Sequence, residues 1–523
     1  MFIFQGEAIL MASNQIIMII AIAVYLLCML YVGWIYSRRN KSTDDFYLGG
    51  RKLGALTTAM SAEASDMSSW LLMGVPGLAY ISGVADAGWT CIGLALGTYL
   101  NWLVVSKRLR NYSADLGAIT LPDFISRRFH DEKHTLSLIS ALIIVIFFVP
   151  YTASGFSACG KLFNTLFGVD YTTAMLISAL VIVLYTTLGG FMAASMTDLI
   201  QSIIMTISLI AVFIFGIGKA GGLNAVMENA KALPGYLSFD QIFDNVSGTA
   251  QSYGFLNKIS MLAWGLGYFG MPHILLRFMG SKNTKQLTLS RRVATIWVVI
   301  SMAAAILIGI VGNAMSKVGA LETFASTTTS ETLIVHLANL ISENGWLAAV
   351  LGGLILAGIL AATMSTADSQ LLAAASSVSK DLVEDCFHAK LNAKKSMLVA
   401  RLAVVAISVV AAVIALDQNS SVFNVVSFAW AGFGAAFGPV VLLSLFWKRT
   451  NKTGALCGMV AGGAMVFLWK YLVRPMGGMW DLYELLPAFI VACVANIIGS
   501  LASKAPDAAV IAEFDAASAK KDD

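Results

Sequence analysis

The chain has 523 residues, of which 58% are hydrophobic and only 12% are charged. This composition excludes an ordinary soluble domain and is typical of a polytopic membrane protein. The formal net charge is +4, and the lysines and arginines are spread over many loops, so charge gives no reason to expect a nucleic-acid partner. The partner that we expect is the lipid bilayer.

About thirteen apolar stretches are long enough to cross a hydrocarbon core about 30 Å thick, which takes roughly 20 residues of helix. Lipid offers no partner to backbone polar groups, so we expect every span to be helical and the fold class to be all-α. The predicted spans are residues 15–36, 53–81, 87–106, 135–164, 171–189, 194–218, 255–279, 292–314, 346–379, 398–416, 423–447, 453–473 and 484–503.

Loops rich in lysine and arginine predict the orientation, because cytoplasmic loops carry the excess of positive charge. In a thirteen-helix count, all of these loops fall on the same side of the membrane. We therefore expect the N-terminus outside, the C-terminus inside and residues 504–523 as a cytoplasmic tail. The loops concerned are residues 38–52, 107–133, 282–292, 380–395 and 448–452.

Two predicted spans contain residues that a continuous membrane helix avoids. The second carries carboxylates and serines between Ser61 and Ser69, and the seventh carries three glycines and a proline between Trp264 and His273. Gly265–Gly270 also matches a G-x-G-x-x-G motif, but no strand precedes it, so we interpret it as a helix break and not as a dinucleotide site. The alternative is that glycine and proline are simply more frequent in membrane helices.

Interrupted spans at matching places in two halves are typical of inverted-repeat transporters, whose binding site lies near the bilayer midplane. We expect a single transmembrane domain over residues 1–503. Its two core repeats would cover about 53–218 and 255–447, and the helices at 15–36, 453–473 and 484–503 would be additional.

Four acidic residues lie within or at the ends of apolar spans, namely Glu63, Asp66, Asp198 and Asp368. A carboxylate at mid-bilayer costs roughly 2.5 to 3.5 kcal/mol, so it persists only where a cation, a proton or another partner compensates it. These residues therefore indicate where the function lies.

Helical spacing places Ser365, Asp368 and Ser369 on one face of the ninth span, with Thr366 and Ala362 on the adjoining face. Hydroxyl and carboxylate oxygens suit a hard cation, and a break in the second span would add backbone carbonyls. Sodium fits better than a transition metal, because no histidine or cysteine is close by in the sequence. Alternatively, the hydroxyls bond to their own helix or join two helices.

Aromatic side chains near the two interruptions predict the substrate. Rings pack against a small apolar body and their faces attract an ammonium group, while backbone N–H groups at the start of a half-helix hold a carboxylate. These properties favour an amino acid over a sugar, although aromatic residues at helical spacing are also common in ordinary packing. The residues concerned are Trp70, Tyr151, Trp264 and Tyr268.

Several segments resemble the sodium:solute symporter family, in particular its bacterial members that import proline. They are Ala64–Gly74 (ASDMSSWLLMG), Trp264–His273 (WGLGYFGMPH), Met364–Thr366 (MST) and Ser427–Pro439 (SFAWAGFGAAFGP). The resemblance runs from about residue 20 to 505. It implies a five-plus-five inverted-repeat (LeuT-like) core in a bacterial cytoplasmic membrane. It also implies sodium as the coupling ion and the import of L-proline by alternating access.

The resemblance also implies roles for individual residues. Arg51 and Asp198 match positions that are functionally important in the family. The sodium site would comprise Ala64, Met67, Ala362, Ser365 and Thr366, with Asp66 essential nearby. The proline pocket would comprise Ser68, Trp70, Tyr151, Trp264, Tyr268 and Pro272.

This chain departs from the family's proline symporters at three positions. They have a small residue in place of Glu63, no carboxylate in place of Asp368, and a glutamine in place of Met271. Relatives that bind a second sodium place it between the equivalents of Ser365, Asp198, Asp368 and Ser369. A second cation is therefore a candidate here. Alternatively, one of the two aspartates is protonated, which avoids repulsion between like charges.

Other function classes remain to be weighed. A symporter of the same fold for another small amino acid or organic solute would differ only in its pocket. A sodium channel would need an open pore, which an aromatic-lined break disfavours. An enzyme would need a nucleophile and base, and neither is visible in the sequence. The loops 219–254 and 315–345 show no legible chemistry, and the oligomeric state is not predictable.

Overall fold

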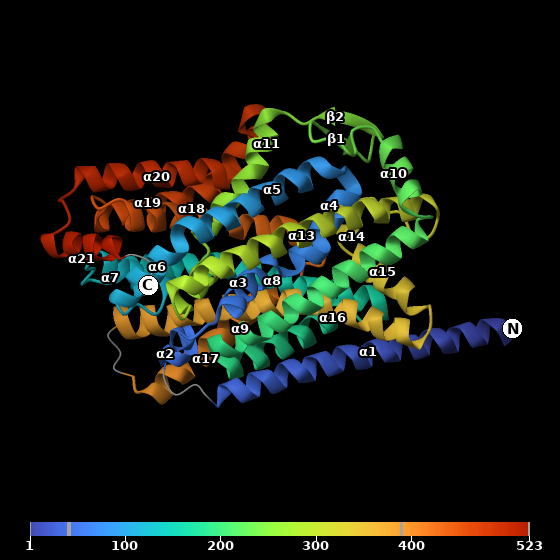
Figure 1. Ribbon diagram of the computed structural model, residues 1–523, viewed down its shortest axis with the longest axis horizontal. Helices are drawn as coiled ribbons and strands as arrows, with labels where there is room; N and C mark the ends of the chain where they lie inside the picture. The colour runs from blue at the N-terminus through green and yellow to red at the C-terminus, as the bar shows by residue number, and fades with distance from the viewer. Residues whose placement is uncertain (1, 39–42, 388–390, 521–523) are drawn as a thin grey trace.

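The computed structural model describes residues 2–38, 43–387 and 391–520. Long helices run roughly along the longest dimension of the molecule, and the two termini lie towards its opposite ends (Figure 1). This placement agrees with the predicted odd number of membrane crossings, which stays a prediction. Parts of two basic loops, at 39–42 and 388–390, and the last three residues of the tail lie outside the described residues.

The bundle consists of long helices, several of which continue into a π-helical turn. The helices within the predicted spans or continuing them are α1 (Phe2–Ser37), α3 (Ala55–Ser69), α4 (Val75–Ser82), α5 (Val84–Leu100), α6 (Ser106–Asp115), α8 (Thr135–Phe167), α9 (Tyr171–Lys219), α11 (Phe255–Leu262), α12 (Pro272–Gly280), α13 (Thr284–Lys317), α16 (Trp346–Ser376), α17 (Ala393–Ile414), α18 (Val422–Phe446), α19 (Lys452–Leu468) and α20 (Leu485–Ala502). The π-helical turns are Trp70–Gly74, Asn101–Val105, Ser377–Cys386 and Trp469–Val473.

Shorter elements cap the two ends of the bundle. They are α2 (Thr43–Leu48), α7 (Leu121–Arg128), α10 (Leu223–Ala232), α14 (Thr327–Ser330), α15 (Leu333–Ser342) and α21 (Ala508–Ala519). The 3-10 segments are Gly49–Arg51, Ala263–Phe269, Arg474–Met476 and Gly478–Trp480. Between α10 and α11, β1 (Gln241–Asp244) pairs antiparallel with β2 (Thr249–Ser252).

The thirteen predicted spans all coincide with helices. Among the described residues, ten helices are long and apolar enough to cross a membrane, and the pair Phe255–Phe269 and Pro272–Gly280, bent by 45°, would be an eleventh. The other two predicted spans are the second, which is broken at Ser68, and the fifth, which retains a shorter apolar helix at Tyr171–Leu184. The all-α membrane fold is confirmed, and the count of thirteen stays a prediction.

The fifth and sixth predicted spans form one element, α9, with a break at Gly190. This residue has φ 65° and ψ −174°, a conformation that glycine adopts without the steric cost that a Cβ imposes. The chain therefore changes direction at Gly190 without a connecting loop.

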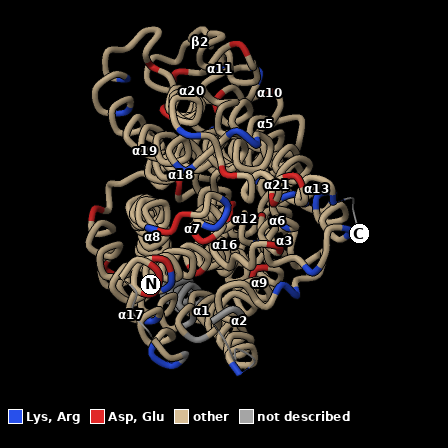
Figure 2. The backbone as a smooth tube through the Cα atoms, turned by 90° about the vertical axis from the view of Figure 1, so that its left-hand side faces the viewer, with Lys and Arg blue, Asp and Glu red and all other residues tan. Residues whose placement is uncertain are grey.

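The basic loop 107–133 contacts each of the other four basic loops at one end of the bundle. Its Ala118 carbonyl accepts from Arg51 at 2.6 Å, and its Thr120 donates to Asp381 at 2.9 Å. Its Asp131 pairs with Lys452 at 2.5 Å, and its Arg110 donates to the carbonyl of Lys282 at 3.2 Å. Figure 2 faces this end and shows lysine and arginine segments distributed around it. The loops share one side, as predicted; that this side is cytoplasmic stays a prediction.

The C-terminal tail forms helix α21 (Ala508–Ala519). Helix α21 buries Phe514, the ring of which lies under the Arg128 guanidinium at 5.1 Å, and Glu513 pairs with His130 at 3.0 Å. The tail therefore packs on the basic end of the bundle, near α6 and α7, as Figure 1 also shows.

Candidate functional site

The second predicted span breaks at Ser68. This residue has φ 47° and ψ −172°, and its hydroxyl accepts a hydrogen bond from the N–H of Trp70 at 3.1 Å. A non-glycine residue in this conformation costs about 1 to 3 kcal/mol, so the surrounding structure must hold it. The break disturbs the helical hydrogen bonds of the preceding turn, whose carbonyls include those of Ala64 and Met67.

Helix α16 supplies hydroxyl groups directly opposite this turn. Ser365 donates to the carbonyl of Ala64 at 2.8 Å and to that of Ala362 at 3.1 Å, and Thr366 donates to the carbonyl of Ala362 at 3.1 Å. Four of the six predicted sodium ligands therefore form one buried group of oxygen atoms. Carbonyl and hydroxyl oxygens are the ligands that a hard cation prefers. The Met67 carbonyl lies in the same turn of α3 and accepts from the N–H of Trp70.

Asp66 connects this oxygen group to the predicted substrate residues. Its side chain is 6% exposed and accepts a hydrogen bond from the hydroxyl of Tyr268, and its carbonyl accepts one from the hydroxyl of Tyr151 at 3.2 Å. Asp66 therefore faces the protein interior and not lipid. Its carboxylate is directed to the seventh span, while the sodium group lies on the α16 side.

The seventh span is broken where the glycine-rich motif predicts. The 3-10 segment Ala263–Phe269 ends at Gly270, and α12 restarts at Pro272, whose missing N–H suits the first turn of a helix. Gly267 explains part of the motif, because a Cβ there would lie 2.0 Å from Nε1 of Trp430. The glycine allows a tryptophan of α18 to approach the backbone of the break.

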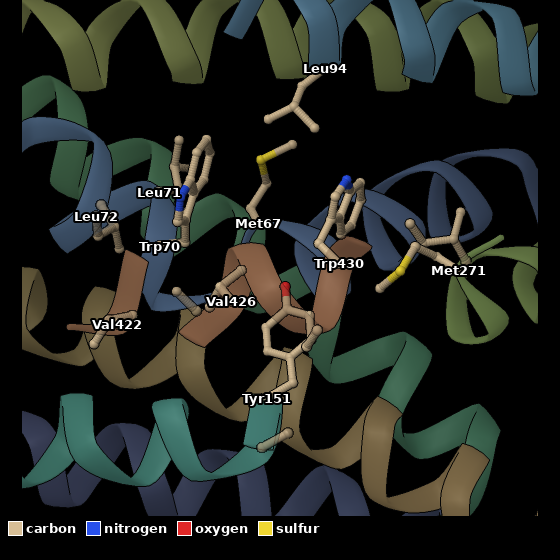
Figure 3. Packing of buried hydrophobic residues seen from close by; sticks show 14 of the residues in the cluster. Met67, Trp70, Leu71, Leu72, Leu94, Tyr151, Met271, Val422, Val426 and Trp430 are labelled. Carbon is tan, nitrogen blue, oxygen red and sulfur yellow. The ribbon is translucent and has the colours of Figure 1, made fainter. Parts of the chain in front are cut away.

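An aromatic cluster lies between the two breaks. The ring of Trp264 lies 5.5 Å from that of Trp70 and 6.5 Å from that of Trp430, and Trp430 donates to the carbonyl of Trp264 at 2.8 Å. The Tyr268 ring meets Trp430 edge-on at 5.1 Å. Figure 3 shows Trp70, Tyr151 and Trp430 entering this buried region from different helices. The structure therefore brings Trp70, Trp264 and Tyr268 together and adds Trp430.

Two further aromatic residues complete the cluster. Phe423, at the start of α18, lies 5.9 Å from Trp70 and 5.5 Å from Trp264, and Tyr483 stacks on Trp264 at 5.1 Å. Phe423 and Trp430 lie on a span that the sequence marks as similar to the family, although their role was not predicted. Tyr483 lies in a loop before α20 and carries no sequence signal.

A small buried cavity joins the two predicted sites. It has a volume of about 10 Å³, room for about one water molecule, and its walls include Ser68 and Tyr151 of the predicted substrate pocket and Thr366 of the predicted sodium group. Thr152 and Gln370 add a polar side, where the threonine hydroxyl donates to the amide oxygen at 3.2 Å. A solute would enter here only after the cavity widens, and it would then lie against both broken α3 and the sodium group on α16.

The predicted second-cation residues surround an arginine. Arg277 of α12 is buried, pairs with Asp198 at 3.1 Å and donates to the hydroxyl of Ser369, which in turn donates to Asp368 at 3.1 Å. Asp198 also accepts from Ser61 at 2.6 Å. Arg277 lies near the end of a predicted span, and the sequence does not mark it as a site residue. Its guanidinium supplies one positive charge to this cluster.

Broken helices at matching places, buried carboxylates and a cavity that joins two ligand groups define a class of protein, the secondary transporters with an inverted-repeat core. Comparison with solved structures agrees. A sodium-coupled sialic acid symporter in a substrate-bound, outward-open state superposes with a TM-score of 0.75 over 94% of this chain and 99% of that one, at 19% identity. This likeness shows the fold.

The family follows from the sequence comparisons. The model of the sodium:solute symporter family matches residues 46–462, and the chain belongs to that family. The sodium/proline symporter of Haemophilus influenzae is 41% identical over 95% of this chain and 97% of its own length. The sodium/proline symporter of Escherichia coli is 39% identical, with 95% of both chains covered.

Proposed function

We propose that this protein imports L-proline together with sodium across a bacterial cytoplasmic membrane by alternating access. The observation that carries the proposal is the sequence identity of about 40% with sodium/proline symporters over nearly the whole chain. Two broken spans, and a small cavity beside the break in α3 that touches both predicted sites, support it. The protein is a transporter and not an enzyme.

For the coupling ion, we propose the oxygen group between α3 and α16. The carbonyls of Ala64, Met67 and Ala362 and the hydroxyls of Ser365 and Thr366 would hold sodium. The Asp66 carboxylate, which lies in the same turn of α3, would balance its charge. Sodium would then stabilise the contact between α3 and α16 in the conformation that binds solute. A ligand shifts a conformational equilibrium only by this differential affinity.

For proline, we propose the region between the sodium group and the aromatic cluster. The rings would cover the apolar pyrrolidine and attract its ammonium group, and N–H groups at the helix breaks would hold the carboxylate. Because α3 contributes to both sites, ordering it around sodium also shapes the solute site. The proposed pocket consists of Ser68, Trp70, Tyr151, Trp264, Tyr268 and Pro272, with Trp430 added from the structure.

One sodium ion that enters through about 100 mV supplies roughly 2.3 kcal/mol, on the order of 50-fold accumulation of proline before any sodium gradient is added. A second ion would roughly square this factor. The candidate second site at Asp198, Asp368 and Ser369 stays a proposal, and any cation there would share the cluster with the Arg277 guanidinium. Substituting Asp368→Ala should lower the steepness of sodium activation if an ion binds there.

The test of the proposed function is uptake of labelled proline by proteoliposomes with and without an inward sodium gradient. We expect accumulation only with the gradient, and competition by excess proline but not by other solutes. Met271 is buried in this region, where the family's proline symporters have a glutamine. Stronger competition by a different small amino acid or organic solute would favour a symporter of the same fold for that solute.

A further inference from the structure

Glu63 is a buried carboxylate that the proposed mechanism does not use. It lies in α3, is 1% exposed, and accepts one hydrogen bond, from Nε1 of Trp102 to its Oε1 at 2.8 Å. Its other oxygen, Oε2, has no hydrogen-bond partner among the residues that the structure describes. An ionised carboxylate in this environment needs a positive partner.

The buried guanidinium of α12 is occupied elsewhere. Arg277 donates its hydrogen bonds to Ser61, Asp198, Ser369 and the carbonyl of His273. The Asp66 carboxylate lies one helical turn from Glu63 and adds a second negative charge to the same helix. In the described part of the chain, no ion pair involves Glu63.

The helix that faces Glu63 presents two more oxygen atoms. Figure 3 shows Met67 of α3 and Leu94 of α5 pointing towards one another, and Trp102, two turns after Leu94, reaches Glu63, one turn before Met67. The two helices therefore run antiparallel where these side chains meet, and Thr98 lies between Leu94 and Trp102 on the same face of α5.

Both Thr98 and Asn101 are buried; Oδ1 of Asn101 has no hydrogen-bond partner among the described residues, and Oγ1 of Thr98 interacts only with the Tyr268 side chain there. The Asn101 side chain donates from Nδ2 to the carbonyl of Tyr268 at 3.0 Å, which fixes the orientation of its amide. Its other atom, Oδ1, can only accept a hydrogen bond or bind a cation. The backbone of α5 also lies close to that of the broken seventh span, because a Cβ on Gly97 would lie 2.3 Å from the carbonyl oxygen of Gly265.

We propose that Glu63, Thr98 and Asn101 form a sodium site of their own, on a different flank of α3 from the Ser365 group. Oε2 of the carboxylate, the hydroxyl oxygen and the amide oxygen are an oxygen-only ligand set suited to a hard monovalent cation. Sodium here would neutralise Glu63 and connect α5 to the broken helix α3. This inference rests on the proposed function, in which it makes proline import a two-sodium process.

The test is the number of sodium ions, measured with radioactive sodium. We expect two ions bound per purified wild-type protein and two transported per proline in proteoliposomes, because the Arg277 guanidinium already balances charge at the other candidate second site, beside Asp198. Glu63→Gln keeps the volume and the acceptor for Trp102 but removes the charge, so it should bind and transport one. Proline accumulation at 100 mV should then fall roughly 50-fold. The matched control is Glu343→Gln in an exposed loop, which should behave as wild type.

One sodium per protein in the wild type, or two in Glu63→Gln, would overturn this inference. Movement of one sodium and one proton per proline would overturn it as well, since Glu63 would then carry the proton. In these cases sodium-dependent proline uptake persists, whereas its absence in the wild type would defeat the proposed function. If uptake is absent, the number of sodium ions bound by the purified wild type and by purified Glu63→Gln still tests the proposed site. If Glu63→Gln does not fold, Thr98→Val should raise the sodium concentration for half-saturation about 5- to 10-fold, and an unchanged value would count against the site.

Discussion

Replacing Arg277 with methionine should destabilise the protein strongly, because this arginine connects both broken spans to the helices around them. Its guanidinium donates to Ser61 of α3, Asp198 of α9, Ser369 of α16 and the His273 carbonyl of its own helix. Both partners of the ion pair are buried, with side-chain exposures of 2% for the arginine and 0% for Asp198.

Breaking a buried ion pair by removing one partner costs about 3 to 5 kcal/mol, because the remaining charge has no compensation. We therefore expect Arg277→Met to lower the free energy of unfolding in mixed micelles by that amount. Arg277→Met combined with Asp198→Asn should recover at least half of the loss, since the new amide would carry no charge and its oxygen could still accept from Ser61. The exposed Arg292→Met on α13 is the control.

Two results would refute this reasoning. The first is a loss below about 1 kcal/mol in Arg277→Met, the value typical of an exposed ion pair. The second is a double variant no more stable than Arg277→Met alone. Adding sodium to Arg277→Met provides a further readout, because a cation that replaces the guanidinium would stabilise the folded protein in proportion to ln(1 + [Na+]/Kd).

Three other substitutions test separate parts of the structure. Ser365→Ala removes a hydroxyl from the sodium group and should raise the half-saturating sodium concentration about tenfold, or ~1.4 kcal/mol, in uptake assays; an unchanged value would remove Ser365 from the site. Lys161 forms a buried ion pair with Glu331 at 2.9 Å, so Lys161→Met leaves the Glu331 charge without a partner and should lower the free energy of unfolding by about 3 to 5 kcal/mol. Adding Glu331→Gln should recover most of this loss. An equal loss in the single and the double variant would contradict this prediction. Gly267→Ala should abolish uptake in a protein that still inserts, because its Cβ would clash with Trp430, whereas Gly218→Ala, where nothing lies within 4 Å, should be active. Normal uptake by Gly267→Ala would show that the Ala263–Phe269 segment and α18 can move apart without loss of transport.

The sequence predicts the helix breaks well, because the residues that cause them are unusual in a membrane. Carboxylates and serines in the second span and glycines with a proline in the seventh are visible without a structure, and both spans break there. The contact between Ser365 and Ala64 joins residues 301 positions apart, and it was anticipated only through the resemblance to a family. The roles of the individual site residues stay predictions.

The residues that the sequence analysis missed depend on distant partners. Arg277 near a span end looks like any basic residue at a membrane boundary, and only the fold places it beside Asp198. Glu331 lies in a loop that showed no legible chemistry, yet it accepts from Lys161, from the hydroxyl of Ser421 and from the backbone N–H of Phe423. Glu331 thereby caps the helix that carries the aromatic cluster, an arrangement that no local pattern predicts.

The most direct test of the account is the sodium activation curve of proline uptake in proteoliposomes, measured for the wild type and for Asp66→Asn. We expect uptake by the wild type to require sodium. Asp66→Asn, inserted at the same level and equally stable, should need a much higher sodium concentration or lose the dependence altogether. Sodium-independent uptake by the wild type, or an unchanged curve in a well-expressed Asp66→Asn, would contradict the claim that sodium and solute bind together around the break in α3.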